Sequence, residues 1–245
     1  MIPKIIHYCW FGPAEMPVLV QSCITSWRKH LPDYEFMFWN ENNFDLNSIS
    51  FTKEAYLAKK YAFVTDYVRV FALEKYGGIY LDTDIEVIKS FNDLLESRAI
   101  LGFEDGISLT ALMGCEKHHP LVCKLLSFYK FLPFNRQNGS LEMTTFNVWM
   151  ERILKEDFKF KANGCKQMCF EGIEVFPCEF FHAKSLVTGE LMRTDKTYAI
   201  HHHTLLWISK KTKIVKFFRQ NIFVPLFGRS IYIWVSDIVK KMIHA

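Results

Sequence analysis

The alternation of short apolar runs with longer periodic runs over the first 90 residues is the feature that most constrains the fold. The apolar runs predict strands and the periodic runs predict helices. Expected strands lie at 4–11, 34–40 and 79–88, and expected helices lie at 17–30, 52–60 and 63–76. Pro17 opens the first helix and Gly77 follows the last, which are positions that these residues favour. Strands that alternate with helices are typical of an α/β domain with a mostly parallel sheet, so we expect that fold class.

The rest of the body continues the same mixture. Further strands are expected at 100–105, 109–116, 173–177 and 197–203, with helices at 119–132 and 144–157. The sequence has no internal repeat and no clean domain boundary before about Ser209. A chain of 245 residues can bury a substantial core as one large domain with an appendage.

The stretch EKYGGIYLDTDIEVIKS, residues 74–90, carries two carboxylates inside an otherwise apolar strand. An unpaired buried charge is costly, and such groups normally bind a metal or a partner. Strand alternation places Asp82 and Asp84 on one face and Thr83 on the other. Two hard oxygen donors on one face suit Mg²⁺ or Mn²⁺ and, through the ion, a substrate phosphate. A solvated pair of acids in a turn is the alternative, against which the apolar flanks argue.

Three other side chains are candidates for ligand binding. Trp10 ends the first strand, at the edge of the sheet where ligands of α/β domains bind, and its ring could stack on a base. Core packing is the alternative for this residue. Asp66 and Arg69 share one face of the helix over 63–76. An ordinary surface ion pair is common, but the surrounding residues are apolar, so the pattern leaves a structural and a functional role equally open.

The run YAIHHHTLLW, residues 198–207, offers imidazole ligands. Alternation sends His202 to one face and His201 with His203 to the other. Neutral imidazole is a good ligand for Mn²⁺ and its neighbours in the transition series. A solvent-exposed polar run is the alternative. A zinc site is disfavoured because no spaced set of Cys and His residues completes a tetrahedron.

Cysteine usage and the absence of targeting patterns predict the cellular compartment of the protein. The seven cysteines are scattered without a CxxC pair, which argues against a disulfide framework and favours a reducing compartment. The N-terminal residues lack the pattern of an export signal, and no apolar run has the length of a spanning helix. We therefore expect a cytoplasmic protein.

The basic charge is concentrated at the C-terminus. Residues 209–245 hold eight of the 30 Lys and Arg residues but only one of the 26 acidic ones. Bulky apolar residues interleave with the basic ones, which favours amphipathic helices at a membrane interface over a helical cap packed on the body. The same interleaving disfavours nucleic-acid binding. The chain is expected to bind the cytoplasmic face of a membrane peripherally.

Four stretches, in order, resemble the bacterial capsular-polysaccharide glycosyltransferases of glycosyltransferase family 32. This family also contains yeast mannosyltransferases and is related to the catalytic domains of the large clostridial glucosylating toxins. The stretches are IPKIIHYCWFG, SWRKHLPDYEFMFWNENNFD, KKYAFVTDYVRVFALEKYGGIYLDTDIEV and YAIHHHTLLW. The resemblance implies a GT-A-type fold over residues 1–208, followed by the basic segment 209–245. It also implies a retaining hexosyltransferase that uses a nucleotide sugar and Mn²⁺ or Mg²⁺.

The resemblance assigns roles to single positions that match the family's motifs. Trp10 is similar to the tryptophan that stacks on the uracil of the donor. Asp66 and Arg69 are similar to the residues that hold the donor's sugar and its ribose or diphosphate. Trp207 is similar to a tryptophan that closes over the leaving diphosphate.

The metal ligands follow from the same resemblance. Asp84 would ligate the metal directly, and Asp82 would reach the ribose or the metal through hydrogen bonds or water. His202 lies where relatives supply a further ligand, with His201 as the second choice. A cation held there, with Arg69 nearby, would stabilise the charge that develops on the leaving diphosphate.

Retention implies attack by the acceptor on the face that the diphosphate leaves. Glu104 and Asp105 are the available carboxylates for a covalent intermediate of the glycosidase kind. Contact with the acceptor or the sugar is the preferred role for both. The sequence departs from the family at Leu205 and Leu206, where a small residue or a hydroxyl usually precedes the tryptophan.

The expected acceptor is a saccharide or a lipid-linked oligosaccharide, in the synthesis of surface polysaccharide or glycolipid. The expected donor is UDP-galactose, UDP-glucose or an N-acetyl form, and GDP-mannose stays open. A catalytically impaired assembly partner at the membrane is one alternative, which the departure before Trp207 would support. An aspartyl phosphatase is a weaker one, because the sequence lacks the later acidic pair that such enzymes need.

Overall fold

The computed structural model describes residues 1–104, 111–204, 214–215, 217–228 and 231. The helices of the body are α1 (Val18–His30), α2 (Ser50–Leu57), α3 (Tyr61–Tyr76), α4 (Pro120–Tyr129), α5 (Phe146–Asp157) and α6 (Cys178–Phe181). The strands are β1 (Ile5–Cys9), β2 (Glu35–Trp39), β3 (Gly78–Leu81), β4 (Ile85–Val87), β5 (Ala99–Gly102), β6 (Leu112–Cys115), β7 (Gln167–Cys169), β8 (Ile173–Phe176) and β9 (Ala199–His201).

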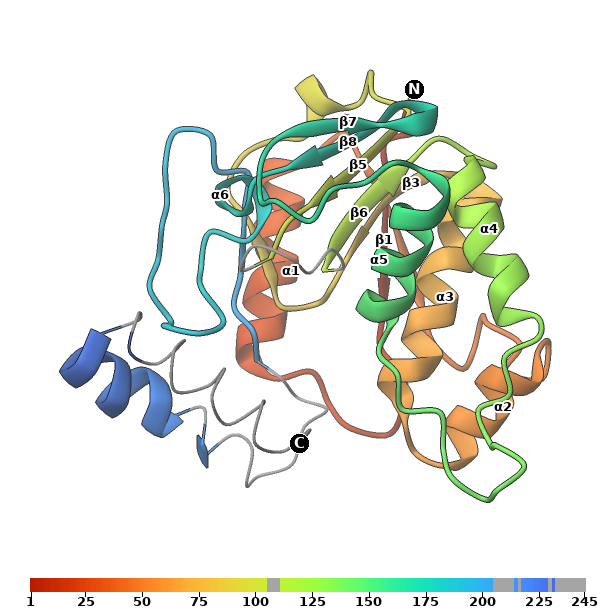
Figure 1. Ribbon diagram of the computed structural model, residues 1–245. Helices are drawn as coiled ribbons and strands as arrows, with labels where there is room; N and C mark the ends of the chain where they lie inside the picture. The colour runs from red at the N-terminus through yellow and green to blue at the C-terminus, as the bar shows by residue number, and fades with distance from the viewer. Residues whose placement is uncertain (105–110, 205–213, 216, 229–230, 232–245) are drawn as a thin grey trace.

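A central sheet of seven of these strands organises the described part of the chain, in the order β2-β1-β3-β6-β5-β8-β7. β1 pairs in parallel with both β2 and β3, and β5 pairs in parallel with β8. β6 and β7 pair antiparallel with their neighbours, so five strands run one way and two run the other. This is a mostly parallel mixed sheet flanked by helices (Figure 1), as the GT-A-type α/β prediction requires.

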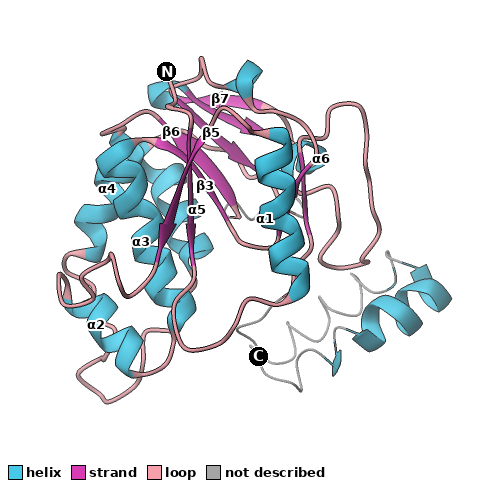
Figure 2. Ribbon diagram, turned by 180° about the vertical axis from the view of Figure 1, so that it is seen from behind, coloured by secondary structure: helices cyan, strands magenta, loops and turns pink. Residues whose placement is uncertain are grey.

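The two faces of the sheet bury separate apolar cores. α3, α4 and α5 cover one face, whereas α1 and α6 lie on the other (Figures 1 and 2). Strand alternation in β3 supplies both cores, because Tyr80 packs among the residues under α3 to α5 while Ile79 and Leu81 pack on the side of α1. A strand buried on both faces reads as a continuous apolar run, which is why GIYL lacks polar residues.

The single strand predicted over 79–88 is wrong. β3 ends at Leu81, and the chain turns through Asp82, Thr83 and Asp84 before β4 begins. The backbone N–H of Ile85 donates to the carbonyl of Asp82 at 3.0 Å, which closes the turn. The two carboxylates therefore do not share the face of one strand.

β4 leaves the central sheet and pairs antiparallel with β9 in a separate two-stranded sheet. α1 holds this small sheet in place. Nε1 of Trp27 donates to the carbonyl of Ile85 at 2.6 Å, and the N–H of Val87 donates to the hydroxyl of Ser26 at 2.9 Å. The small sheet brings residues 199–204 beside the Asp82–Asp84 turn.

Helix and strand positions otherwise follow the predictions to within a few residues. α3 ends at Gly77, whose φ of 67° lies in the left-handed region that glycine favours. Gly78 has a φ of 100°, and a Cβ there would lie 2.6 Å from the carbonyl oxygen of Ile5, so β3 can approach β1 only without a side chain. The short elements β7 and α6 were not predicted.

Residues 217–228 of the basic segment form a helical stretch that includes a π-helical turn over Arg219–Phe223. It lies beside the long loop before β9 (Figure 1), and Nε2 of Gln220 donates to the carbonyl of Leu186 at 2.8 Å. Several of its apolar side chains are exposed, including Phe217, Leu226 and Phe227. No described helix is both long and apolar enough to cross a bilayer. Most other residues of 209–245 lie outside the described ranges.

Candidate active site

The carboxyl ends of β1 and β3 form one side of the site. The parallel register pairs His7 with Tyr80, so the residues that follow the two strands, Trp10 and Asp82, lie at the same edge of the sheet. Trp10 is partly exposed, and its Nε1 donates to the carbonyl of Ala14 at 2.6 Å. This hydrogen bond fixes the indole at the edge of the sheet.

A partly buried charge cluster joins α3 to the end of β3. Nη2 of Arg69 lies 2.9 Å from Oδ1 of Asp66 and 3.4 Å from Oδ1 of Asp82. The hydroxyl of Tyr80 donates to the same oxygen of Asp82 at 2.8 Å. The guanidinium also lies over the rings of Tyr80 and Phe146, at 4.6 and 5.2 Å from their centres. Asp66 and Arg69 are thus not a surface ion pair, and they contact the first Asp of the turn.

Burial dominates the electrostatics of this cluster. It raises the pKa of Asp66 to about 6, although the charge of Arg69 acts in the opposite direction. It also raises the pKa of Asp82, again against the charge of Arg69. Arg69 stays charged at every pH at which the two carboxylates titrate. The cluster therefore has one permanent cation between Asp66 and Asp82.

Asp84 points away from this cluster, toward the end of β9. Its Oδ2 accepts from the N–H of Thr204 at 2.8 Å and from the hydroxyl of Thr204 at 2.7 Å. Its Oδ1 lies 3.2 Å from Nε2 of His201. Burial opposes ionisation of Asp84, but the charge and hydrogen bond of His201 and the hydrogen bonds of Thr204 outweigh it and hold the pKa of this carboxyl below its usual range.

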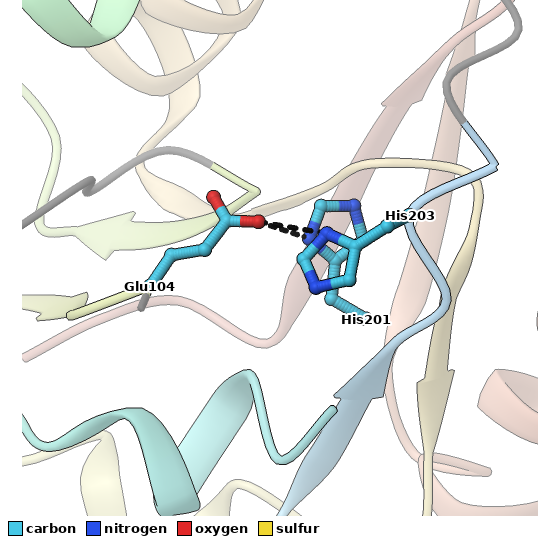
Figure 3. Close-up of side chains that lie close together, drawn as sticks. All are labelled: Glu104, His201 and His203. Atoms are coloured by element: carbon cyan, nitrogen blue, oxygen red, sulfur yellow. Dashed lines mark hydrogen bonds and ion pairs between the residues drawn. The ribbon is translucent and has the colours of Figure 1, made fainter. Parts of the chain in front are cut away.

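Glu104, two residues after the end of β5, contacts two of the three histidines. Its Oε1 lies 2.9 Å from Nδ1 of His201 and 2.9 Å from Nδ1 of His203 (Figure 3). Burial lowers the pKa of His201, but Asp84 and Glu104 more than reverse this effect and raise that pKa well above its usual value. The pKa of Glu104 is held well below its usual value: burial opposes this, and the charge and hydrogen bonds of the histidines prevail.

The predicted alternation of the three histidines is confirmed. His201 and His203 face Glu104, whereas Nε2 of His202 lies 2.9 Å from Oε2 of Glu86 on the other side. His201, the second choice for a metal ligand, is thus the histidine that contacts Asp84. The choice between His201 and His202 stays a prediction, and the geometry favours His201.

Asp84 and His201 fit a divalent cation. Neighbouring ligands in an octahedral site with bonds of about 2.1 Å are about 3 Å apart. Oδ1 of Asp84 and Nε2 of His201 are 3.2 Å apart, so both could bind one ion with little movement. Glu104, His201 and His203 form a second set, whose donor atoms lie within 4.8 Å of one another.

Sequence reasoning missed part of this polar cluster. His182 is buried, its Nδ1 donates to the carbonyl of Phe103 at 2.9 Å, and burial lowers its pKa to about 4. Thr204 was not singled out, although it directly follows the histidine run. Only the proximity of Thr204 to that run could have indicated its role, and nothing in the sequence near His182 did. Trp207, Asp105, Leu205 and Leu206 lie outside the described residues.

Residues 17–101 match the family model described as "Glycosyltransferase sugar-binding region containing DXD motif". This region contains Asp66, Arg69 and both carboxylates of the turn. The match over these residues agrees with the predicted class of enzyme, a glycosyltransferase, and the D-x-D motif within it is the one at Asp82 and Asp84.

Among curated proteins, the chain is similar to fungal mannosyltransferases. It is 33% identical over 143 residues to "Inositol phosphoceramide mannosyltransferase 3" of Schizosaccharomyces pombe, which covers 55% of this chain and 39% of that protein. It is 31% identical over 159 residues to "Mannosyl phosphorylinositol ceramide synthase CSH1" of Saccharomyces cerevisiae, covering 57% and 40%. The chain thus spans about two fifths of the length of these relatives.

Two solved structures to which this chain is similar are described as glycosyltransferases. "PaToxG Glycosyltransferase" superposes with a TM-score of 0.48 at 17% identity, over 64% of this chain and 70% of that one. A glycosyltransferase involved in glycosylation of the major capsid of PBCV-1 superposes with a TM-score of 0.46 at 11% identity, over 82% and 95%.

Proposed function

We propose that this chain is a metal-dependent glycosyltransferase that moves a hexose from a nucleotide sugar to a saccharide or lipid-linked acceptor, with retention of configuration. The observation that carries the proposal is the contact of Asp84 with His201, at 3.2 Å between Oδ1 and Nε2. It joins the second carboxylate of the D-x-D motif to a histidine from a separate sheet. An oxygen and a nitrogen donor held this close suit Mn²⁺ or Mg²⁺.

In this proposal each residue of the site has a role toward the donor. Asp84 and His201 hold the divalent cation, which supplies positive charge for the leaving diphosphate when it is bound. Arg69 adds a fixed cation beside Asp82, which also stabilises charge on the diphosphate. Asp82 hydrogen-bonds the ribose or the ion's water, and Trp10 stacks on the base.

The retaining mechanism is proposed to use same-face attack rather than a covalent intermediate on Glu104. Oε1 of Glu104 already accepts from Nδ1 of His201 at 2.9 Å and lies 2.9 Å from Nδ1 of His203. The residue is only 8% exposed, which leaves its carboxylate little freedom to attack a sugar. A nucleophile must reach the reacting carbon, so this environment suits a supporting group better.

The names of the relatives shift the expected donor and acceptor. The sequence alone placed UDP-hexoses first, whereas the two relatives are named for mannosyl transfer to an inositol phosphoceramide. We therefore include GDP-mannose beside UDP-galactose and UDP-glucose as a donor, and place a lipid-linked polyol or sugar first as acceptor. Each of these donors and acceptors is compatible with the synthesis of a surface polysaccharide or glycolipid.

A calorimetric and thermal-shift panel tests the proposal. UDP, GDP, UDP-galactose, UDP-glucose and GDP-mannose are added with and without Mn²⁺ to the wild type, Asp84→Asn and the control Asp157→Asn at the exposed end of α5. Manganese-dependent binding of one nucleotide sugar is expected for the wild type and the control but not for Asp84→Asn. Absence of nucleotide binding by the wild type would contradict the function and favour an inactive assembly partner.

We also propose that the basic segment binds the cytoplasmic surface of a membrane, where a lipid-linked acceptor would be presented. Phe217 is 59% exposed next to basic residues, which suits an anionic lipid interface. Cosedimentation with anionic vesicles should fall for Phe217→Asp. It should not fall for Phe131→Asp, which changes a phenylalanine that is 81% exposed after α4. Equal loss in both variants would contradict the assignment.

A further inference from the structure

His201 lies between two carboxylates that come from distant parts of the chain. Its Nδ1 donates to Oε1 of Glu104 at 2.9 Å, and its Nε2 lies 3.2 Å from Oδ1 of Asp84. All three residues are 8% exposed. Because an imidazole is rigid and planar, a bond that fixes Nδ1 also fixes the direction of Nε2.

Glu104 is itself held in place, so it can act as a fixed support. It is the second residue after β5, and the N–H of the intervening Phe103 donates to the carbonyl of Phe176 at 2.9 Å. Its Oε1 also contacts Nδ1 of His203 at 2.9 Å. The His203 ring is also held in place, because its Nε2 donates to the carbonyl of Lys184 at 2.7 Å.

We propose that Glu104 is a positioning residue for the metal site: it holds Nδ1 of His201 so that Nε2 is directed at the cation position beside Asp84. The inference rests on the proposed function, which places the cation there. A carboxylate behind a ligating imidazole fixes its tautomer and orientation, and loss of such a partner typically weakens metal binding by about 10–100-fold.

The chain contains a matched control for this arrangement. His202 and Glu86 form a second histidine–carboxylate pair, at 2.9 Å between Nε2 and Oε2. The side chains of this pair lie on the opposite side from the His201 ring. The backbone N–H of His202 donates to the carbonyl of Asp84 at 3.0 Å, but this bond does not involve the Glu86 side chain. The Glu86 side chain is 40% exposed, so its neutralisation should leave the metal position unchanged.

A competing arrangement would place a cation among Glu104, His201 and His203 themselves. The 2.9 Å separations from Oε1 to both Nδ1 atoms are ordinary hydrogen-bond distances, which an ion would have to replace. That site would also leave the D-x-D motif unused. We therefore favour Glu104 as the support of a ligand rather than as a ligand.

The first test measures Mn²⁺ affinity on the full chain by the electron paramagnetic resonance signal of free Mn²⁺, with UDP or GDP present at saturation. The variants are Glu104→Gln, Glu86→Gln and Asp84→Ala. We expect about 10–100-fold weaker binding in Glu104→Gln, wild-type binding in Glu86→Gln and loss of binding in Asp84→Ala. Wild-type affinity in a folded Glu104→Gln, with binding lost in Asp84→Ala, would overturn this inference alone. No Mn²⁺ binding by the wild type would overturn the proposed function as well.

The second test needs no variant. It therefore distinguishes Glu104 as the support of His201 from Glu104 as a metal ligand even if Glu104→Gln fails to fold. Long-range ¹H–¹⁵N spectra of the histidine rings are recorded on the wild type during titration with diamagnetic Cd²⁺. Nε2 of His201 should shift on binding, while its Nδ1 keeps its proton and its bond to Glu104. Shifts at Nδ1 of both His201 and His203 would show the competing site and overturn the inference.

Discussion

Nη2 of Arg69 lies 3.4 Å from Oδ1 of Asp82, so the middle of α3 is joined to the end of β3 by a charge pair. The same nitrogen lies 2.9 Å from Asp66. Removing the cation leaves the largely buried carboxylate of Asp66 and the partly exposed one of Asp82 without this counter-charge. Arg69→Met should therefore lower the free energy of unfolding by about 3 kcal/mol in urea denaturation. Arg152→Met, which breaks an exposed pair with Glu156, should cost less than about 1 kcal/mol. Similar losses in the two variants would contradict the role of burial.

Asp66 should make stability depend on pH in a defined direction. Its pKa rises from 3.8 in the unfolded chain to about 6 in the folded one, mainly through burial. Between these values the folded state binds the proton more tightly, so this residue's contribution to the free energy of unfolding falls as the pH rises from about 4 to 6. Asp66→Asn removes that contribution. The variant should gain roughly 2–3 kcal/mol relative to the wild type between pH 4 and 7. A constant difference across the range would contradict the raised pKa.

The two adjacent histidines should differ in their effect on metal binding. His201 contacts Asp84, whereas His202 contacts Glu86. His201→Ala should lose more than the roughly 100-fold in Mn²⁺ affinity that an outer partner can cost. His202→Ala should stay within about threefold of the wild type, by the same measurement. The reverse order would return the ligand role to His202. Chelation of the metal should abolish donor hydrolysis in every variant.

The loop after β1 depends on a glycine. Gly12 has a φ of 89°, and a Cβ there would lie 2.5 Å from the ring of Tyr61. Gly12→Ala should lower the free energy of unfolding by about 1–3 kcal/mol and weaken nucleotide binding, because Trp10 precedes this turn. Gly139→Ala is the control. Gly139 has a φ of 79° but no neighbour within 4 Å, so this change adds backbone strain without a steric clash. Both changes are measured by thermal unfolding and by nucleotide calorimetry. Weaker nucleotide binding in Gly139→Ala alone would contradict the role of the loop.

Local patterns predicted most of the helices and strands. Proline at the start of α1 and glycine after α3 fixed helix ends, and apolar runs located β1, β2 and β3. The strand over 79–88 was predicted too long because apolar residues lie on both sides of the turn, as in β3 and β4. A short-range pattern cannot distinguish one strand from two strands that enter different sheets. β7 and α6 were missed because they contain only three and four residues.

The sequence predicted which residues form the site better than it predicted which of them contact one another. Asp82 and Asp84 follow β3 at the expected edge of the sheet, and Asp66 and Arg69 share a face of α3, from which Arg69 contacts Asp82. Alternation through the histidine run, which begins at the last residue of β9, correctly separated His202 from His201 and His203, but it could not tell which side faces Asp84. The support from Glu104 was not predicted, since it depends on how β5 lies relative to β9. Such packing is a property of the assembled layers, and no local spacing encodes it.

The separation of β4 from the central sheet has a consequence for folding. Asp84 meets Thr204 across 120 residues of sequence, and Glu104 meets His201 across 97. Closing loops of this length carries an entropic cost that precedes any gain from the contacts. The D-x-D motif is therefore chemically incomplete until the C-terminal half of the body has docked. A nascent chain that has emerged only through residue 101 carries the motif in full and has no site.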